Sequence, residues 1–296
     1  MRILVTALLS LVLVSPLLAH SGVRHRSSER SISLDDRGSG PLDCGALTVT
    51  FGGEAATVQE ERMELPGGEL KVRVQEQGGI YVQHGSGSGY TARLCKAAAD
   101  PALLSDVRVA QQGRSLTVEG PAGEDRWVGY LIVDAPSDAS LRVESDNAPI
   151  TLKRVRGSFV AKAQNGPIAI EDAAGTIDAS TENGPIALSG SEGEVKLRAA
   201  NGPIAVELDR EWRGKGLDAR TQNGPLAVTV SSAFRSGVVL ESDGTSPWDC
   251  DGPSCEGWRI HGSGQDGGRT FTLGDGPALV HLSTSNGPVA IQSPEQ

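Results

Sequence analysis

Apolar and polar residues alternate along much of this chain, and over residues 136–230 the alternation repeats at a fixed distance. Asparagines recur at steps of 18 residues at positions 147, 165, 183 and 201, and the next follows 22 residues later at 223. Each unit holds two short segments with apolar residues at every second position, as in Ile168 and Ile170, then Ile177 and Ala179. Alternate residues of a strand point to the same side. Each unit therefore predicts two strands with one apolar face.

The tripeptide Asn-Gly-Pro precedes the first strand of most units. Asn tolerates left-handed backbone angles and its amide can bond to a neighbouring amide. Gly removes the Cβ at the tightest point, and Pro is acceptable as the first residue of a strand. We therefore predict a structural corner along which stacked asparagines form a ladder. The residues assigned to this corner are Asn147, Asn165, Gly166, Pro167, Asn183, Gly184, Pro185, Asn201, Gly202, Pro203, Asn223, Gly224, Pro225, Asn286, Gly287 and Pro288.

Stacking these units predicts an all-β fold, a parallel β-solenoid or β-helix with rungs of about 18 residues. Equivalent strands of successive rungs would pair in parallel, about 4.8 Å apart. The 38 glycines and the scarcity of aromatic residues, at 4%, agree with many short strands and tight turns. Isolated hairpins with Asn-Gly turns are the alternative. The glycine column Gly157, Gly175 and Gly193 keeps the same period and favours the solenoid.

The regions before and after the regular repeat, residues 136–230, are predicted to differ from it. Residues 1–19, with Arg2, an apolar run and small residues near Ala19, predict a signal peptide, and a retained anchor is the alternative. The Ser- and Arg-rich stretch 20–41 predicts a flexible leader. Residues 42–135 predict irregular strands that begin or cap the solenoid. Residues 231–276 predict a decorated loop region that interrupts it, and residues 277–296 a final rung with a polar tail.

The chain has four cysteines, Cys44, Cys95, Cys250 and Cys255. An exported chain meets an oxidising compartment, which favours disulfides. Of the three possible pairings we favour Cys44 with Cys95 and Cys250 with Cys255, because each pair lies within one half of the chain. A metal site is the alternative, but no second CxxC or His pair stands at zinc spacing. The sequence predicts no metal and no cofactor.

The formal net charge is −10, and the part of the chain predicted to fold has no basic run. A nucleic-acid binder needs a stripe of Lys and Arg to displace counterions from phosphates. The charge pattern therefore excludes nucleic acid as a partner. No apolar stretch beyond the signal peptide is long enough to span a bilayer, so we expect membrane contact only through that transient segment.

The step from Asn201 to Asn223 carries four extra residues, and insertions between rungs form protruding loops. Trp212, flanked by Arg210 and Arg213, is the candidate ligand contact on this loop. The alternative is that the Trp side chain covers the hydrophobic core, which its large apolar area favours.

The stretch LIVDAPSDASLRVESDNAPITL, followed by Asn-Gly-Pro-Ile units, resembles a family of exported bacterial β-strand repeat proteins grouped as putative adhesins, a domain of unknown function. The resemblance covers roughly residues 70–230 and the last rung. It implies a parallel β-solenoid outside the cytoplasm. The family has no assigned catalytic residues, so none are carried over, and the Cys250–Cys255 loop departs from its plain repeat.

These features favour a non-enzymatic exported protein, periplasmic or on the cell surface, with an adhesin-like structural or interaction role. Its expected partners are an envelope polysaccharide or another envelope protein. A polysaccharide-processing β-helix enzyme is the alternative, for which the nearest carboxylates are Glu171 with Asp172 and Asp209 with Glu211. No catalytic residue is assigned, because adjacent strand residues such as Glu171 and Asp172 face opposite sides. A second alternative is an exported accessory or sensor partner of a membrane protein.

Overall fold

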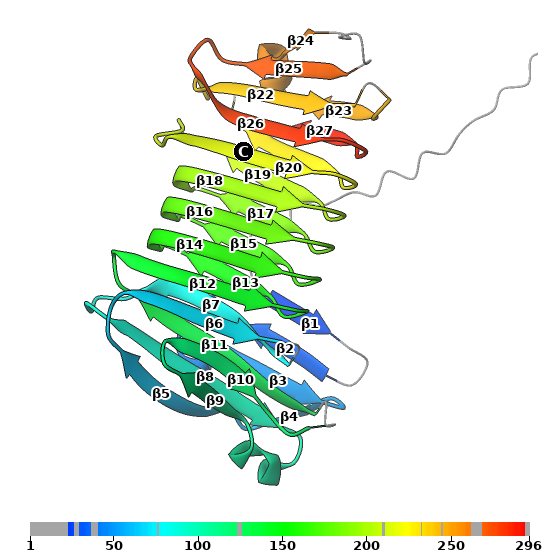
Figure 1. Cartoon of the computed structure of the whole chain (residues 1–296). Coiled ribbons are helices and arrows are strands. Elements are labelled where there is room, and N and C mark those ends of the chain that lie inside the picture. The colour runs from blue at the N-terminus through cyan, green and yellow to red at the C-terminus, as the bar shows by residue number, and fades with distance from the viewer. Residues whose placement is uncertain are drawn as a thin grey trace, which may run out of the picture.

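The computed structural model describes residues 23–26, 30–36, 41–75, 77–122, 126–208, 211–231, 233–243, 245–261 and 268–293. These residues form an all-β protein with two large sheets and one small sheet, and none of them lies in an α-helix (Figure 1). Short 3-10 helices connect some strands: η1 (Cys44–Ala46), η2 (Pro101–Ser105) and η3 (Pro253–Gly257). The predicted signal peptide, residues 1–19, lies outside the described residues.

Most strands belong to the two large sheets. The twelve-stranded sheet has the order β24 (Arg259–His261), β25 (Arg269–Leu273), β22 (Gly237–Ser242), β26 (Ala278–Thr284), β20 (Gly216–Thr221), β18 (Glu192–Ala199), β16 (Ala174–Thr181), β14 (Arg156–Ala163), β12 (Ala139–Ser145), β6 (Glu69–Val74), β10 (Ser115–Glu119) and β9 (Arg108–Gln112). The eleven-stranded sheet has the order β23 (Trp248–Asp251), β27 (Val289–Gln292), β21 (Leu226–Val230), β19 (Ile204–Leu208), β17 (Ile186–Ser189), β15 (Ile168–Glu171), β13 (Ile150–Lys153), β7 (Gly78–His84), β11 (Trp127–Ala135), β8 (Tyr90–Ala98) and β5 (Gln59–Leu65).

From β12 to β21 the chain alternates between the two large sheets, and we call each consecutive pair of strands a rung (Figure 1). Each strand pairs in parallel with the equivalent strand of the next rung. Ile168, Ile186 and Ile204 are therefore direct neighbours in one column. The hairpin alternative is wrong for this region, because consecutive strands lie in different sheets.

The corner asparagines form a continuous ladder of side-chain hydrogen bonds. Nδ2 of Asn165 donates to Oδ1 of Asn147 at 2.8 Å, and Nδ2 of Asn183 donates to Oδ1 of Asn165 at 2.8 Å. The same bond joins the further corner asparagines at 2.9 to 3.0 Å, up to Asn286. The ladder satisfies polar groups along the edge where the chain passes from one sheet to the other.

At each corner glycine, the backbone of the adjacent rung leaves no room for a side chain. A Cβ on Gly184 would lie 2.2 Å from the carbonyl oxygen of Gly166, and one on Gly202 would lie 1.8 Å from that of Gly184. The first corner of the series has Ala148 instead of glycine. Ala148 is buried, at 1% exposed, and the adjacent rung, β6 with β7, has no Asn-Gly-Pro tripeptide.

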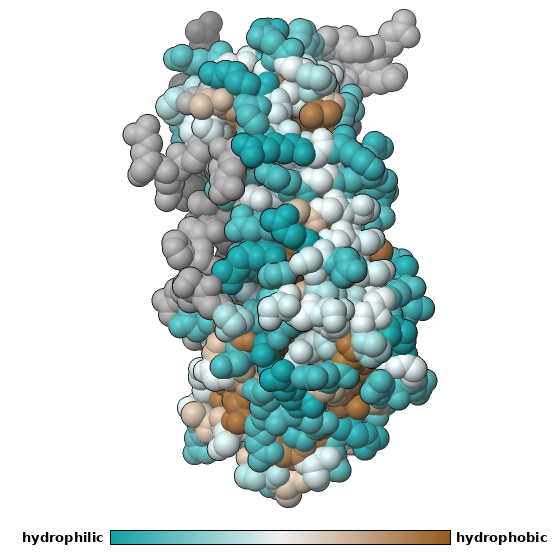
Figure 2. Space-filling model, turned by 90° about the vertical axis from the view of Figure 1, so that its left-hand side faces the viewer, coloured by the Kyte–Doolittle hydropathy of each residue, from teal (hydrophilic) through white to brown (hydrophobic). Residues whose placement is uncertain are grey.

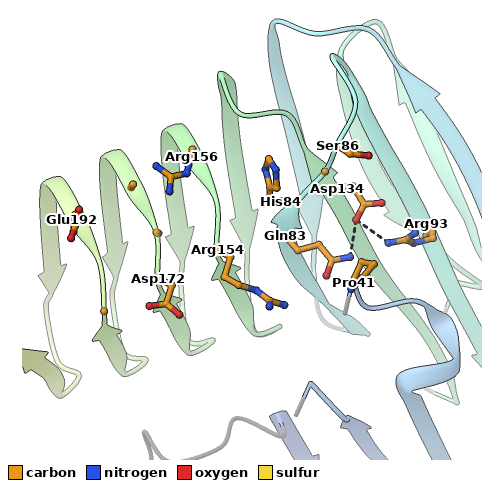
Figure 3. Close-up of a pocket in the computed structure, with 14 residues that line it drawn as sticks. Pro41, Gln83, His84, Ser86, Arg93, Asp134, Arg154, Arg156, Asp172 and Glu192 are labelled. Atoms are coloured by element: carbon orange, nitrogen blue, oxygen red, sulfur yellow. Dashed lines mark hydrogen bonds and ion pairs between the residues drawn. The ribbon is translucent and has the colours of Figure 1, made fainter. Parts of the chain in front are cut away.

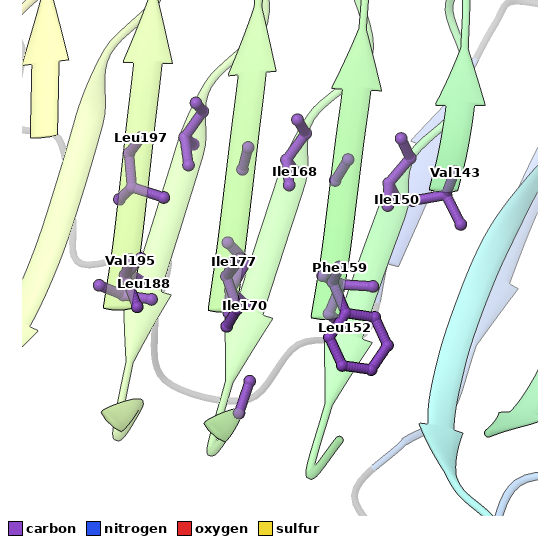
Figure 4. Packing of buried hydrophobic residues seen from close by; sticks show 14 of the residues in the cluster. Val143, Ile150, Leu152, Phe159, Ile168, Ile170, Ile177, Leu188, Val195 and Leu197 are labelled. Carbon is purple, nitrogen blue, oxygen red and sulfur yellow. The ribbon is translucent and has the colours of Figure 1, made fainter. Parts of the chain in front are cut away.

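Between the two large sheets lies a core of inward-facing apolar side chains (Figure 4). Phe159, Ile177 and Val195 of one sheet pack opposite Ile168 and Ile170 of the other, and all five are at most 1% exposed. Burial of each large apolar side chain stabilises the fold by about 1.5 to 3 kcal/mol. The interior between the rungs is thus filled by the chain's own side chains.

The rungs at both ends of the stack do not follow chain order. β26 and β27 lie between the β20/β21 rung and the β22/β23 rung. In the same way, β6 and β7 lie between the β12/β13 rung and the β10/β11 rung. Antiparallel strands extend the sheets beyond these end rungs, β25 and β24 at one end and β5, β8 and β9 at the other.

The sequence predicts a loop region for residues 231–276. In the structure these residues contain the strands β22 to β25. The interval between the Asp-Gly-Pro tripeptides at 251 and 275 does not match whole rungs, because the chain leaves the stack through β24 and β25 before it returns. The predicted last rung is present as β26 and β27, but it lies inside the stack. Asn286 accordingly stacks directly on Asn223.

The stretch 20–41, for which the sequence predicts a flexible leader, holds two strands. β1 (Val23–Arg26) and β2 (Arg30–Leu34) join β3 (Leu47–Phe51) and β4 (Glu54–Ala55) in a small antiparallel sheet. Ile32 and Leu34 of β2 are buried in a second core with Tyr81, Val128 and Ile132, on strands β7 and β11. The alternation in Arg30–Leu34 gives β2 a buried apolar face, so this segment is ordered despite its Ser and Arg content.

A disulfide and a group of ion pairs attach the small sheet to the rest of the protein. The disulfides are Cys44–Cys95 and Cys250–Cys255, the two pairings favoured from the sequence. Lys153 Nζ lies 3.0 Å from Asp36 Oδ2 and 2.8 Å from Glu171 Oε2. Burial by itself lowers the pKa of Lys153, but the hydrogen bonds to Glu171 and Asp36 outweigh it and raise the pKa above its usual value. Lys153 is therefore a charged link between the β2–β3 connection and the second regular rung.

In the described part of the chain, no helix has the length and apolar character needed to cross a membrane.

Candidate functional site

A cavity of about 830 Å³ opens beside the turns that follow β13, β15 and β17 (Figure 3). The ends of β7 and β11 form its other wall. The described side chains that line it are mostly polar or charged: Gln83, His84, Ser86, Arg93, Asp134, Arg154, Arg156, Asp172 and Glu192. Two other concave features lined by charged residues, one beside Lys196 and one beside Arg73, have volumes of about 410 and 420 Å³.

The wall formed by β7, β8 and β11 is fixed by its own hydrogen bonds. Arg93 Nη2 lies 2.9 Å from Asp134 Oδ1 and donates to the carbonyl oxygen of Leu42 at 2.7 Å. Gln83 Nε2 donates to Asp134 Oδ1 at 2.7 Å, and Gln83 Oε1 accepts from the N–H of Leu42 at 2.8 Å. Arg93 and Asp134 are largely buried, so this network holds the wall in place.

The opposite wall is a column of turn residues with left-handed backbone angles. Arg154, Asp172 and Gly190 occupy equivalent positions of successive rungs, with φ of 54°, 50° and 58°. Arg154 and Asp172 are the described residues other than glycine that adopt a positive φ. This conformation costs a residue with a Cβ about 1 to 2 kcal/mol. Both strained residues line the cavity, and such strain is concentrated at functional sites.

Charge is distributed unevenly along the cavity. Arg154, Arg156 and His84 lie in its middle, with Asp172 and Glu192 toward one end and the Arg93–Asp134 pair at the other (Figure 3). Arg154, Arg156 and Asp172 are exposed, and Glu192 is half-buried. The face of the molecule in Figure 2 is hydrophilic over most of its height, and apolar side chains gather mainly toward the end with the N-terminal strands.

The cavity was not predicted from the sequence, because the residues that line it come from segments that are far apart in the chain. No motif connects Gln83, Arg93 and Asp134 with the turns of the rungs. One signal was present: the turn position taken by Gly190 is occupied by Arg154 and Asp172 in the two preceding units, at the 18-residue period. A bulky charged residue where the turn suits glycine could have indicated a site.

Trp212, the candidate ligand contact, belongs to the core and not to the ligand-accessible surface. Its side chain is 6% exposed and packs in the main core, and its backbone N–H donates to Ser236 Oγ at 3.0 Å. The side chain thus covers the core, as the alternative interpretation holds. Arg213 is exposed on the same loop, and Arg210 lies outside the described residues.

We expect Trp212→Phe to leave ligand binding unchanged and to shift the free energy of unfolding by only about 1 kcal/mol. The indole Nε1 is buried without a hydrogen-bond partner, so its removal offsets part of the lost packing. Urea unfolding and calorimetric titration of the variant check both parts. A large loss of binding at unchanged stability would return Trp212 to the list of ligand contacts.

Of the carboxylates considered for an enzyme, Glu171 and Glu211 have structural partners, and Asp172 lines the cavity. Glu171 binds Lys153, and Glu211 accepts hydrogen bonds from the Ser236 hydroxyl at 2.6 Å and from the Arg235 N–H. The hydrogen bond from Ser236 is the main cause that lowers the pKa of Glu211, which disfavours it as a general acid. Asp209 lies outside the described residues. Within the described residues, no group of three or more His, Cys, Asp or Glu could hold a metal ion.

No protein-family model matches the sequence, and neither does any curated protein. Solved structures do match, and three of them are the following. A putative adhesin from Bacteroides fragilis is 11% identical over 80% of this chain and 97% of that chain, with a TM-score of 0.37. A putative adhesin from Parabacteroides merdae is 11% identical over 80% and 96%, with a TM-score of 0.36. A putative cell adhesion protein from Clostridium sporogenes is 8% identical over 80% and 100%, with a TM-score of 0.31.

The names of these structures agree with the family resemblance noted in the repeat.

Proposed function

We propose that this chain is an exported, non-enzymatic β-solenoid of the cell envelope that binds a polar envelope component on its outer surface. The alternation of the chain between two sheets and the in-register parallel pairing of rungs support the solenoid. The signal-like residues 1–19 and the two disulfides support export to an oxidising compartment.

The observation that carries the proposal is the combination of a filled interior and a charged cavity outside it. Inward-facing side chains such as Ile177 and Ile170 occupy the space between the large sheets. A ligand must therefore be bound by outward-facing residues, and the cavity beside the turns offers a large concave surface lined by charged side chains. The stacked rungs form a rigid support, which suits the presentation of a binding surface.

The proposal is tested by titrating the full chain with purified polysaccharides from bacterial envelopes and analysing the same mixtures for released sugars. We expect saturable binding without product release. Release of oligosaccharides would favour the polysaccharide-processing alternative. Absence of binding to every polysaccharide, together with capture of a single membrane protein from native envelopes, would favour the accessory or sensor role.

A further inference from the structure

We propose that Asn286 is a site of spontaneous deamidation in the folded protein, and that the asparagine ladder protects the other corner asparagines from the same reaction. This inference concerns a covalent modification and does not depend on the ligand of the proposed function. It rests on the place of each asparagine in the ladder and on the residue that follows it.

Deamidation needs an asparagine whose amide can turn toward the backbone nitrogen of the next residue. That nitrogen loses its proton to a base and attacks Cγ, and a cyclic succinimide forms. The Cγ–Nδ2 bond breaks, and the amide nitrogen takes up a proton and leaves as ammonia. Water then opens the ring to aspartate or isoaspartate, so one water is consumed for each ammonia released. Glycine as the next residue favours the attack, because no Cβ crowds its nitrogen.

The reactive dipeptide Asn-Gly occurs only in the ladder. All six asparagines of the chain are corner residues, and five of them precede glycine. The other places where Asn or Asp precedes glycine, at positions 243, 251, 266 and 275, all have aspartate, which has no amide to lose. Asn147, the first member of the ladder, precedes Ala148 and so lacks the reactive dipeptide.

Inside the ladder each amide is held on both sides. Asn183 donates through Nδ2 to Asn165 at 2.8 Å, and its Oδ1 accepts from Asn201 at 3.0 Å. Before its Cγ can reach the backbone nitrogen of Gly184, the side chain must rotate and both bonds must break. We use the name interior asparagines for the residues that have such a pair of bonds: Asn165, Asn183, Asn201 and Asn223.

Asn286 is the last member of the ladder and makes a single ladder bond. Its Nδ2 donates to Asn223 Oδ1 at 2.9 Å, and its own Oδ1 accepts no hydrogen bond within the described part of the chain. The equivalent corner position of the next rung, β22 with β23, is Thr245, whose hydroxyl donates to Asp243 Oδ1 at 3.0 Å. Asn286 is exposed and precedes Gly287. Among the six asparagines, it alone combines the reactive dipeptide with an end position.

Deamidation of Asn286 weakens the rung formed by β26 and β27. A carboxylate only accepts hydrogen bonds, so it cannot donate to Asn223, and its charge repels the Asn223 oxygen. Isoaspartate also adds an atom to the main chain at a crowded corner, where a Cβ on Gly287 would lie 1.8 Å from the carbonyl oxygen of Gly224. We therefore expect the modified protein to unfold at a lower urea concentration.

The test is incubation of the folded full chain in mildly alkaline buffer, followed by proteolysis and mass spectrometry of the corner peptides. We expect Asn286 to deamidate about fivefold faster than the interior asparagines, since one hydrogen bond fewer must break before the attack. In urea the five asparagines that precede Gly-Pro should react at similar rates, because the ladder is then absent.

A substitution at Thr245 tests whether the missing ladder bond is the cause. Thr245→Asn extends the ladder, because the new amide can donate to Asn286 Oδ1 as each later member donates to the one before it. This variant should slow the deamidation of Asn286 to the rate of the interior asparagines. Thr245→Ala, the matched control, removes the same exposed hydroxyl without adding an amide and should leave the rate unchanged.

Two kinds of result would overturn the inference. The first is a rate at Asn286 no higher than at the interior asparagines in the folded chain, including no reaction at Asn286 while the chain in urea reacts. The second is a rate at Asn286 that Thr245→Asn leaves unchanged, or that both Thr245 variants slow equally, because the missing ladder bond is then not the cause.

Discussion

Replacing one corner glycine, Gly202→Ala, is expected to destabilise the protein by about 3 kcal/mol or more. The added Cβ would lie 1.8 Å from the carbonyl oxygen of Gly184 and 2.7 Å from its carbonyl carbon. Both are backbone atoms of the adjacent rung, so a side-chain rotation cannot relieve the clash. The two rungs must separate locally, which weakens their hydrogen bonds and the contact between Asn201 and Asn183.

Urea unfolding measures this loss, and Gly87→Ala is the matched control. Gly87 is exposed, and its nearest neighbours to an added Cβ are at 3.8 and 3.9 Å. The control should change the free energy of unfolding by no more than about 0.5 kcal/mol. Equal effects of the two substitutions would mean that close contact between corners does not constrain the stack.

Removing the disulfide between Cys44 and Cys95 by a double substitution to alanine is expected to lower the free energy of unfolding by about 4 kcal/mol. The bridge joins residues 51 apart in the sequence and attaches the small sheet to β8. A crosslink of this length strongly restricts the unfolded chain, and Cys95 is fully buried, so the loss of packing adds to the effect.

The second disulfide provides the comparison. Cys250 and Cys255 are 5 residues apart, so the double substitution to alanine should lower the free energy of unfolding by about 2 kcal/mol. Both variants are measured by urea unfolding without reductant. A smaller loss for the Cys44 and Cys95 variant than for the other would show that the small sheet is held mainly by the contacts of Ile32 and Leu34 and by the Lys153 ion pairs.

The regular part of the fold was predictable because each rung repeats its own sequence in register. The alternation of apolar and polar residues predicted which side chains of each strand face inward. The 18-residue period aligned Ile168 with Ile186 and Asn165 with Asn183. The all-β class and the parallel sheets follow from these local facts. The order of the end rungs does not, because Asn286 stacks on a residue 63 positions earlier, and sequence spacing cannot reveal such a return.

The small sheet and the cavity escaped prediction for related reasons. Ser and Arg residues in 20–41 suggested a leader, although the alternation around Ile32 and Leu34 is that of a strand with one buried face. The cavity depends on how the ends of β7 and β11 approach the turns of the rungs, and this arrangement exists only after the stack has formed. Local patterns specify strands and turns, whereas a site built from distant segments depends on the tertiary packing.

The position of β26 and β27 between the β20/β21 and β22/β23 rungs has a consequence for how the protein matures. The β22/β23 rung is synthesised before residues 278–292, but it pairs with the strands that these residues form. The rungs therefore cannot assemble simply in the order in which they are synthesised. We expect the stack of rungs in a nascent chain to stay incomplete until residues 278–292 have been synthesised. Insertion of β26 and β27 then joins the β22/β23 rung to the rest of the stack.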